Sequence, residues 1–150
     1  MSAAPADPVV RELSHLVMGA ARRLRAAFNA AAAEQGLTRV QALALLNLRE
    51  SAPMRDLARW LSCDPSNVTQ LVDALERRGL VSRSPSPQDR RVKVLVLTDE
   101  GRRRQALLRE RGDAQAAALF AELAAEDRAL LRDLLARLPD GDCGEDCAPA

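Results

Sequence analysis

Few side chains in this 150-residue sequence could carry out covalent or metal chemistry. His15 is the only histidine, tyrosine is absent, and the sequence contains neither a glycine-rich phosphate loop nor a nucleophile motif. The carboxylates are paired in sequence with arginines on predicted helix surfaces, which is typical of solvated helix faces. We therefore predict that the protein is not an enzyme and that it carries no cofactor and no metal site.

The three cysteines are candidate redox residues. Cys143 and Cys147 lie in the acidic segment "DCGEDC", where they could close a disulfide or share a soft metal ion with His15. C-x-x-x-C is not a standard zinc pair, and a disordered tail is the simpler interpretation. Cys63 could be a small apolar turn residue or, beside a helix N-terminus, a reactive thiolate. These alternatives stay open.

Arginines in one loop indicate a different chemistry, the recognition of phosphates or bases. The segment Ser84–Gly101, "SPSPQDRRVKVLVLTDEG", places Arg90 and Arg91 between turn-forming residues and an apolar run. Met54 to Thr98 holds eight basic residues against five acidic ones, whereas Pro139 to Ala150 holds four acidic residues and no basic one. Loop arginines alone are usually just solvated, so their meaning depends on the elements that position them.

Apolar residues at three- and four-residue steps predict helices over much of the chain. The first helix runs from Asp7 to about Glu34. A T-x-x-Q capping box at Thr38 and Gln41 then opens a second helix that continues through Leu48. With 47% apolar residues, the chain can bury the core of one domain.

Two short helices joined by a tight turn follow. The first is Met54 to Leu61, in which Trp60 is expected in the core. Asp64 as N-cap and Pro65 at the first helical position open the second, which ends near Gly79. Because the apolar residues of this second helix share one face, its polar residues face outward or flank that face. These are Ser66, Asn67, Thr69, Gln70, Asp73 and Arg77.

A small hairpin and two more helices complete the prediction. Leu80 to Arg83 and Val92 to Leu97 flank a loop rich in serine and proline, with the two loop arginines at its tip. Thr98 is a natural N-cap for a long helix, and a last helix ends at Pro139.

This order of elements predicts a winged helix-turn-helix that reads DNA. The second short helix would enter the major groove, where short polar side chains reach base edges, and the hairpin would reach the neighbouring backbone or the minor groove. The predicted DNA-binding residues are Ser66, Asn67, Thr69, Gln70, Arg77, Arg90, Arg91 and Lys93.

The segment "RDLARWLSCDPSNVTQLVDALERRGLVSRSPSPQDRRVKVLVLTDEG" resembles the core of the MarR family of winged-helix regulators. The resemblance lies in "LA..L", "VTQLVDALERRGLV.R", "DRR" and "LT..G". It implies a homodimeric repressor of a pseudo-palindromic operator, released by a small ligand or by oxidation. By motif position, Arg91 would reach the minor groove and Asp89 would brace the wing arginine. The sequence departs from the family at Gln70, where an arginine commonly follows the threonine.

The resemblance covers nearly the whole chain and implies its organisation. We expect one domain over residues 1–150, mainly α with a small β-hairpin wing. Residues 7–35 and 99–138 would form N- and C-terminal dimerisation helices that flank a winged helix-turn-helix at 38–98. Residues 139–150 would be a mobile acidic tail.

The apolar stripes of the terminal helices also predict a dimer, because so small a winged core cannot cover them. The alternative is that they pack within one chain. The predicted interface residues are Val10, Leu13, Val17, Leu131, Leu134 and Leu138.

Other partners are less well defined by the sequence. The resemblance implies an effector pocket between the dimerisation helices and the winged core, and Arg22, Arg23 and Arg25 could meet an anionic effector unless they are simply solvated. No apolar run reaches about 18 residues, so we expect a cytoplasmic protein without a membrane partner. The alternative function is a winged-helix protein-interaction module that does not bind specific DNA.

Overall fold

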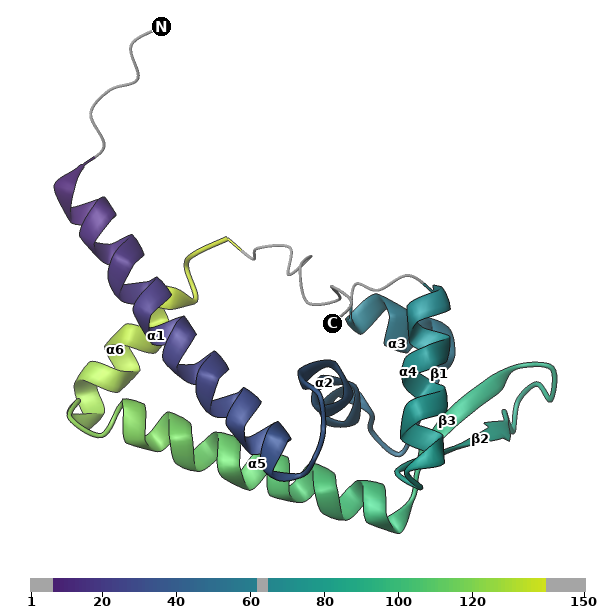
Figure 1. Cartoon of the computed structure of the whole chain (residues 1–150). Helices are drawn as coiled ribbons and strands as arrows, with labels where there is room; N and C mark the ends of the chain where they lie inside the picture. The colour runs from purple at the N-terminus through teal and green to yellow at the C-terminus, as the bar shows by residue number, and fades with distance from the viewer. Residues whose placement is uncertain (1–6, 62–64, 140–150) are drawn as a thin grey trace, which may run out of the picture.

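A computed structural model describes residues 7–61 and 65–139 of the chain. The helices and strands are α1 (Pro8–Glu34), α2 (Arg39–Asn47), β1 (Ser51–Pro53), α3 (Met54–Trp60), α4 (Pro65–Arg77), β2 (Val81–Pro85), β3 (Lys93–Leu97), α5 (Asp99–Leu119) and α6 (Ala125–Leu135). In Figure 1, α5 runs from the strands and α4 at one end of the molecule to α1 and α6 at the other. The predicted fold class, mainly helical with a small β wing, is confirmed.

Local hydrogen bonds explain where the helices start. Asp7 caps α1 by accepting the N–H of Val9 at 2.9 Å. The predicted capping box of α2 is confirmed, because Thr38 Oγ1 accepts the N–H of Gln41 at 3.3 Å and Gln41 Oε1 accepts the N–H of Thr38 at 3.1 Å. Thr98 caps α5 as expected, by accepting the N–H of Gly101 at 3.0 Å.

The sheet has one more strand than the predicted hairpin. Its order is β1-β3-β2, and β3 pairs antiparallel with both neighbours. Strand β1 was missed because it is only three residues long and its partner lies more than forty residues further along the chain. The predicted start of β2 at Leu80 is one residue early, because the N–H of Leu80 donates to the carbonyl of Leu75 and completes the C-terminal cap of α4.

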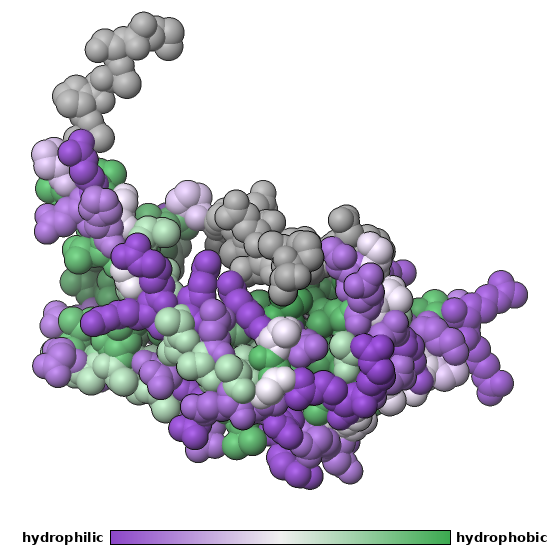
Figure 2. Space-filling view, viewed as in Figure 1, coloured by the Kyte–Doolittle hydropathy of each residue, from purple (hydrophilic) through white to green (hydrophobic). Residues whose placement is uncertain are grey.

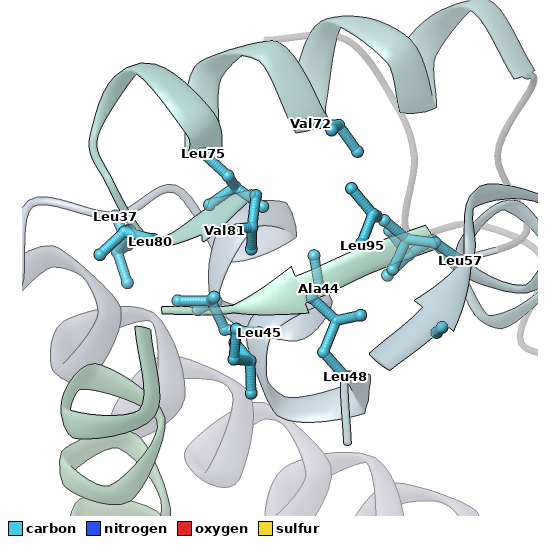
Figure 3. Close-up of a cluster of buried hydrophobic side chains, with 14 of the residues drawn as sticks. Leu37, Ala44, Leu45, Leu48, Leu57, Val72, Leu75, Leu80, Val81 and Leu95 are labelled. Carbon is cyan, nitrogen blue, oxygen red and sulfur yellow. The ribbon is translucent and has the colours of Figure 1, made fainter. Parts of the chain in front are cut away.

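Leucine and valine side chains from α2, α3, α4 and the strands form the core (Figure 3). The expectation that Trp60 lies in this core is wrong, because 42% of the residue is exposed. Leu57 and Leu61 already occupy the inward face of α3, and Trp60 falls to one side of that face. Burial at the other end of the molecule is far lower, since α1 buries only Ala31 and Ala32 fully and α6 buries no residue.

The last helix is shorter than expected. Helix α6 ends at Leu135, and turns rather than helix lead to Pro139. Because α6 has no buried residue, packing does not hold its final turn in helical form. Within residues 7–61 and 65–139, none of the helices combines the length and the apolar composition that crossing a bilayer requires.

Candidate nucleic-acid interface

Helix α4 presents a polar face to solvent. It begins at Pro65, and its Val68, Val72 and Leu75 are buried against the core. The helical period therefore turns the polar positions between them outward. Ser66, Thr69, Gln70 and Arg77 are exposed and Asn67 is partly exposed. The predicted N-cap of α4, Asp64, lies outside the described residues.

Two carboxylates of α4, which remain partly exposed to solvent, form ion pairs with the wing. Asp73 Oδ1 lies 2.5 Å from Nη2 of Arg83 on β2, and Glu76 Oε2 lies 2.5 Å from Nη1 of the same guanidinium. Glu76 also accepts the backbone N–H of Arg83 at 3.2 Å. The hydrogen bond that Arg83 donates to Asp73 raises the pKa of Arg83, whose side chain is 26% exposed. This clamp fixes the base of the wing to α4.

The sequence prediction did not identify Arg83 as part of the site. Asp73 and Glu76 lie three residues apart on one helix face, and an arginine on the following strand was a visible signal. Whether they meet depends on how the hairpin folds back onto α4, which no local pattern specifies.

The wing loop presents its basic residues to solvent. The N–H of Ser86 donates to the carbonyl of Val92 at 2.8 Å and closes the loop. Asp89 Oδ1 accepts the backbone N–H of Arg91 at 2.9 Å, so the bond found for Asp89 is with the arginine's backbone. Arg90, Arg91 and Lys93 are exposed. Figure 2 shows hydrophilic side chains gathered on this projecting wing.

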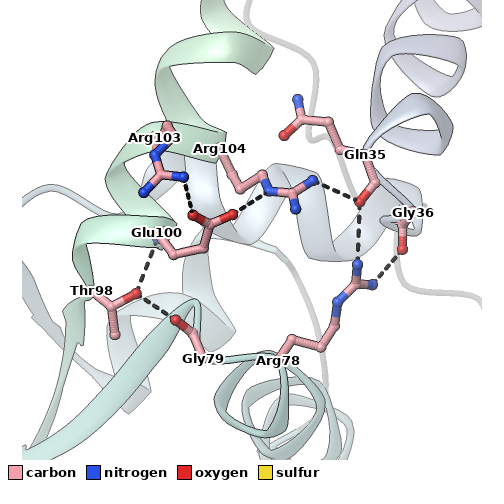
Figure 4. A network of polar contacts seen from close by, with 9 residues as sticks. Gln35, Gly36, Arg78, Gly79, Thr98, Glu100, Arg103 and Arg104 are labelled. Atoms are coloured by element: carbon pink, nitrogen blue, oxygen red, sulfur yellow. Dashed lines mark hydrogen bonds and ion pairs between the residues drawn. The ribbon is translucent and has the colours of Figure 1, made fainter.

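The C-terminal end of α4 fits closely against the start of α5 (Figure 4). Gly79 has a φ of 67°, which closes α4. Thr98 Oγ1 donates to the carbonyl of Gly79 at 2.5 Å, and the N–H of Thr98 donates to the carbonyl of Leu80 at 3.1 Å. A Cβ on Gly101 would lie 2.0 Å from the same Leu80 oxygen. Only glycine therefore fits at this point of α5.

Comparison with known proteins agrees with this geometry. Residues 37–93 match the model of the MarR family. The HTH-type transcriptional repressor NicR of Pseudomonas putida is 33% identical over 106 residues, an alignment that covers 67% of this chain and 67% of NicR. The chain belongs to the MarR family.

Two further proteins are similar to this MarR-family chain. The uncharacterized HTH-type transcriptional regulator YdgJ of Bacillus subtilis is 34% identical over 101 residues, which cover 67% of this chain but 62% of YdgJ, less than two thirds of its length. CouR of Rhodococcus jostii RHA1, solved bound to p-coumaroyl-CoA, has a TM-score of 0.63 and 33% identity over 89% of this chain and 93% of CouR. The chain therefore belongs to a family of transcriptional regulators, which agrees with the prediction that it is not an enzyme.

The predicted dimerisation residues of the MarR-family chain are uncovered. Leu13 is 54% exposed, and Val10, Val17, Leu134 and Leu138 are exposed to a similar degree. Leu131 is partly exposed. The alternative in which these stripes pack within one chain is therefore not the arrangement found. That they meet a second copy stays a prediction.

A groove lies along α1 near the end of α5. Its volume is about 540 Å³, and its lining includes His15, Leu16, Arg22, Arg23 and Leu119. Arg25 is not part of this lining. The groove is thus formed by two of the predicted dimerisation helices and does not extend to the winged core.

The candidate redox residues fall outside the described parts of the chain. Cys63, Cys143 and Cys147 belong to segments that the structure does not describe. Within the described segments, no group of three or more histidine, cysteine, aspartate or glutamate side chains lies close enough to hold a metal ion. The redox prediction therefore stays a prediction.

Proposed function

We propose that this regulator binds a pseudo-palindromic operator as a homodimer and represses transcription. The observation that carries the proposal is the exposed polar face of α4, held by the Arg83 clamp beside a wing with three exposed basic residues. Short polar side chains on such a helix suit base edges in the major groove, and basic wing residues suit phosphates or a narrow minor groove. Because this clamp fixes α4 and the wing to each other, both elements can contact the same operator half-site.

The uncovered apolar stripes support the homodimer. Exposed leucines and valines on α1 and α6 form an apolar surface of the kind that normally marks an interface. A two-fold axis through these helices would carry two copies of α4 to successive major grooves, about 34 Å apart along B-DNA. Losing the dimer would leave each copy with one half-site and much weaker binding.

We further propose that a small anionic effector releases the operator in the cytoplasm. His15, Arg22 and Arg23 surround a groove whose other lining residues are largely apolar, which suits a ligand with a charged group and an apolar body. CouR was solved with a small molecule bound. Oxidation of Cys63, Cys143 or Cys147 is the second release mechanism that we propose.

Electrophoretic mobility shift of the DNA upstream of the protein's own gene tests the operator proposal. A random duplex of the same length is the control, and both are measured at physiological salt. We expect the upstream DNA to bind at least about 1,000-fold more tightly than the random duplex. Equal weak binding to both would contradict the proposal and favour the protein-interaction module.

A further inference from the structure

Arg77 and Arg78 are neighbours at the end of α4, but their side chains have different surroundings. Arg77 is exposed, and its side chain makes no hydrogen bond or ion pair with any residue that the structure describes. The guanidinium of Arg78 donates to the carbonyls of Gly36, through Nη1, and Gln35, through Nη2 at 3.2 Å. These carbonyls belong to the turn between α1 and α2. Figure 4 shows Arg78 reaching across to that turn.

The Gln35 carbonyl is a meeting point of three helices. It lies at the C-terminal cap of α1. It accepts from Arg78, the residue that directly follows α4, and from Nη1 of Arg104 of α5 at 3.3 Å. Arg104 is itself held by Glu100, whose Oε1 lies 2.7 Å from Nε of Arg104. The end of α1, the end of α4 and the start of α5 are therefore linked through one oxygen.

These links connect α4 directly to the helices that would form the dimer. Along its length α4 packs on α2, α3 and β2, and the described residues show no comparable packing against α1 or α5. Its direct contact with α1 is the pair of hydrogen bonds that Arg78 donates to the carbonyls of Gly36 and Gln35, called here the Arg78 fork. Its direct contact with α5 is formed by the hydrogen bonds of Thr98 to the carbonyls of Gly79 and Leu80. The orientation of α4 relative to α1 and α5 thus depends on these direct polar contacts together with its packing on α2, which itself packs on both helices.

We propose that Arg78 is a positioning residue that sets the orientation of α4 relative to the dimerisation helices, and so the spacing of operator half-sites that the dimer accepts. The inference rests on the proposed homodimeric operator binding. A planar guanidinium that bonds two successive carbonyls resists rotation in a way that one flexible ammonium cannot. Because the two copies of α4 must reach grooves one turn apart, a small rotation of each would change their separation.

The geometry of the turn supports this role. Gly36 has a φ of 65°, and a Cβ at this position would lie 3.2 Å from Nη2 of Arg78. A side chain at position 36 would therefore strain the backbone and press on the guanidinium at once. Glycine at residue 36 therefore suits both the backbone conformation of the turn and the position of the Arg78 guanidinium.

Half-site spacing provides the test. The operator is first selected from a random duplex library with the wild-type protein, and duplexes with one or two base pairs added or removed at its centre are then compared with it. We expect Arg78→Ala to lower the preference for the native spacing by about two- to thirtyfold, the range over which single residues between coupled sites act. The dependence of affinity on salt should stay unchanged, because Arg78 makes no proposed phosphate contact.

Arg77→Ala is the matched control, since the same residue type is removed one position away. It should weaken binding to every duplex and reduce the salt slope by about one, while the spacing preference stays at the wild-type level. Arg78→Lys keeps the positive charge but cannot donate the same two hydrogen bonds to the carbonyls of Gly36 and Gln35. We therefore expect it to lose the preference for the native half-site spacing, as Arg78→Ala does. It replaces Arg78→Ala if that variant fails to fold in circular dichroism and sedimentation.

The outcomes separate the inference from the proposed function. A wild-type protein that selects no two-fold site would overturn both. A wild-type protein with a clear spacing preference that Arg78→Ala or Arg78→Lys retains in full would overturn only the positioning role. A lower salt slope for Arg78→Ala would also overturn it, because Arg78 would then be a phosphate contact.

Discussion

The contact between Gly101 and Leu80 predicts that two glycine-to-alanine changes in α5 have opposite effects on stability. Alanine is favoured over glycine in a helix by about 1 kcal/mol. A methyl group at Gly112 would meet no heavy atom within 4 Å beyond its own helix and chain neighbours, so Gly112→Ala should gain up to this amount. At Gly101 the new Cβ would lie 2.0 Å from the Leu80 carbonyl oxygen, which is far inside van der Waals contact.

The clash at Gly101 cannot be relieved by a side-chain movement. The nearest atom belongs to the backbone, and the same Leu80 oxygen accepts the N–H of Thr98 at 3.1 Å. Moving α5 away by about 1 Å would weaken this bond and the Thr98 to Gly79 bond, each worth about 1 kcal/mol. Adding the usual cost of overpacking, about 1–3 kcal/mol, and subtracting the helix gain, we expect a net loss of about 2–4 kcal/mol for Gly101→Ala.

Urea unfolding followed by circular dichroism measures both variants. Protein concentration is held fixed, because a dimer's apparent stability depends on it. The reasoning is refuted if Gly101→Ala is as stable as the wild type, or if Gly112→Ala loses as much as Gly101→Ala. The first result would mean that α5 and the end of α4 are not in close contact, and the second that glycine matters in α5 for another reason.

Three further predictions concern the reading helix, the wing and the dimer. Gln70→Arg should shift preference from adenine toward guanine at one operator position by about 1–3 kcal/mol, as measured by competition between base-substituted duplexes; an unchanged preference would remove Gln70 from base reading. Arg83→Ala should lower the free energy of unfolding by about 1–2 kcal/mol, since its two ion pairs are partly screened by solvent. Combined with Asp73→Ala it should cost less than the sum of the single changes, and strict additivity in urea unfolding would argue against the clamp. Leu13→Glu should dissociate the proposed dimer in sedimentation, because an unpaired carboxylate in each copy would cost several kcal/mol. A variant that dimerises as the wild type does would exclude Leu13 from the interface.

Features that depend on neighbours in the sequence were predictable. The capping box at Thr38 and the cap at Thr98 need only residues three positions away, and both are confirmed. The boundary of the last helix was not predictable, because its final turn depends on packing that α6 lacks. The exposure of Trp60 was missed for a related reason, since residue type alone suggested burial while Leu57 and Leu61 already filled the inward face.

The candidate functional residues also fall into a group that the sequence could predict and a group that it could not. The exposed positions of α4 and the wing arginines follow from helical period and from the order of the elements, so the sequence alone indicated which residues are exposed to solvent. Arg77 and Arg78, by contrast, are the same residue type at adjacent positions in a segment that indicates only basic charge. One is free to meet DNA, whereas the other bonds carbonyls 42 and 43 residues away in the chain. That difference arises from the approach of the end of α4 to the turn between α1 and α2, and it allows two adjacent arginines to take the separate roles proposed for them, one in contacting DNA and the other in positioning α4.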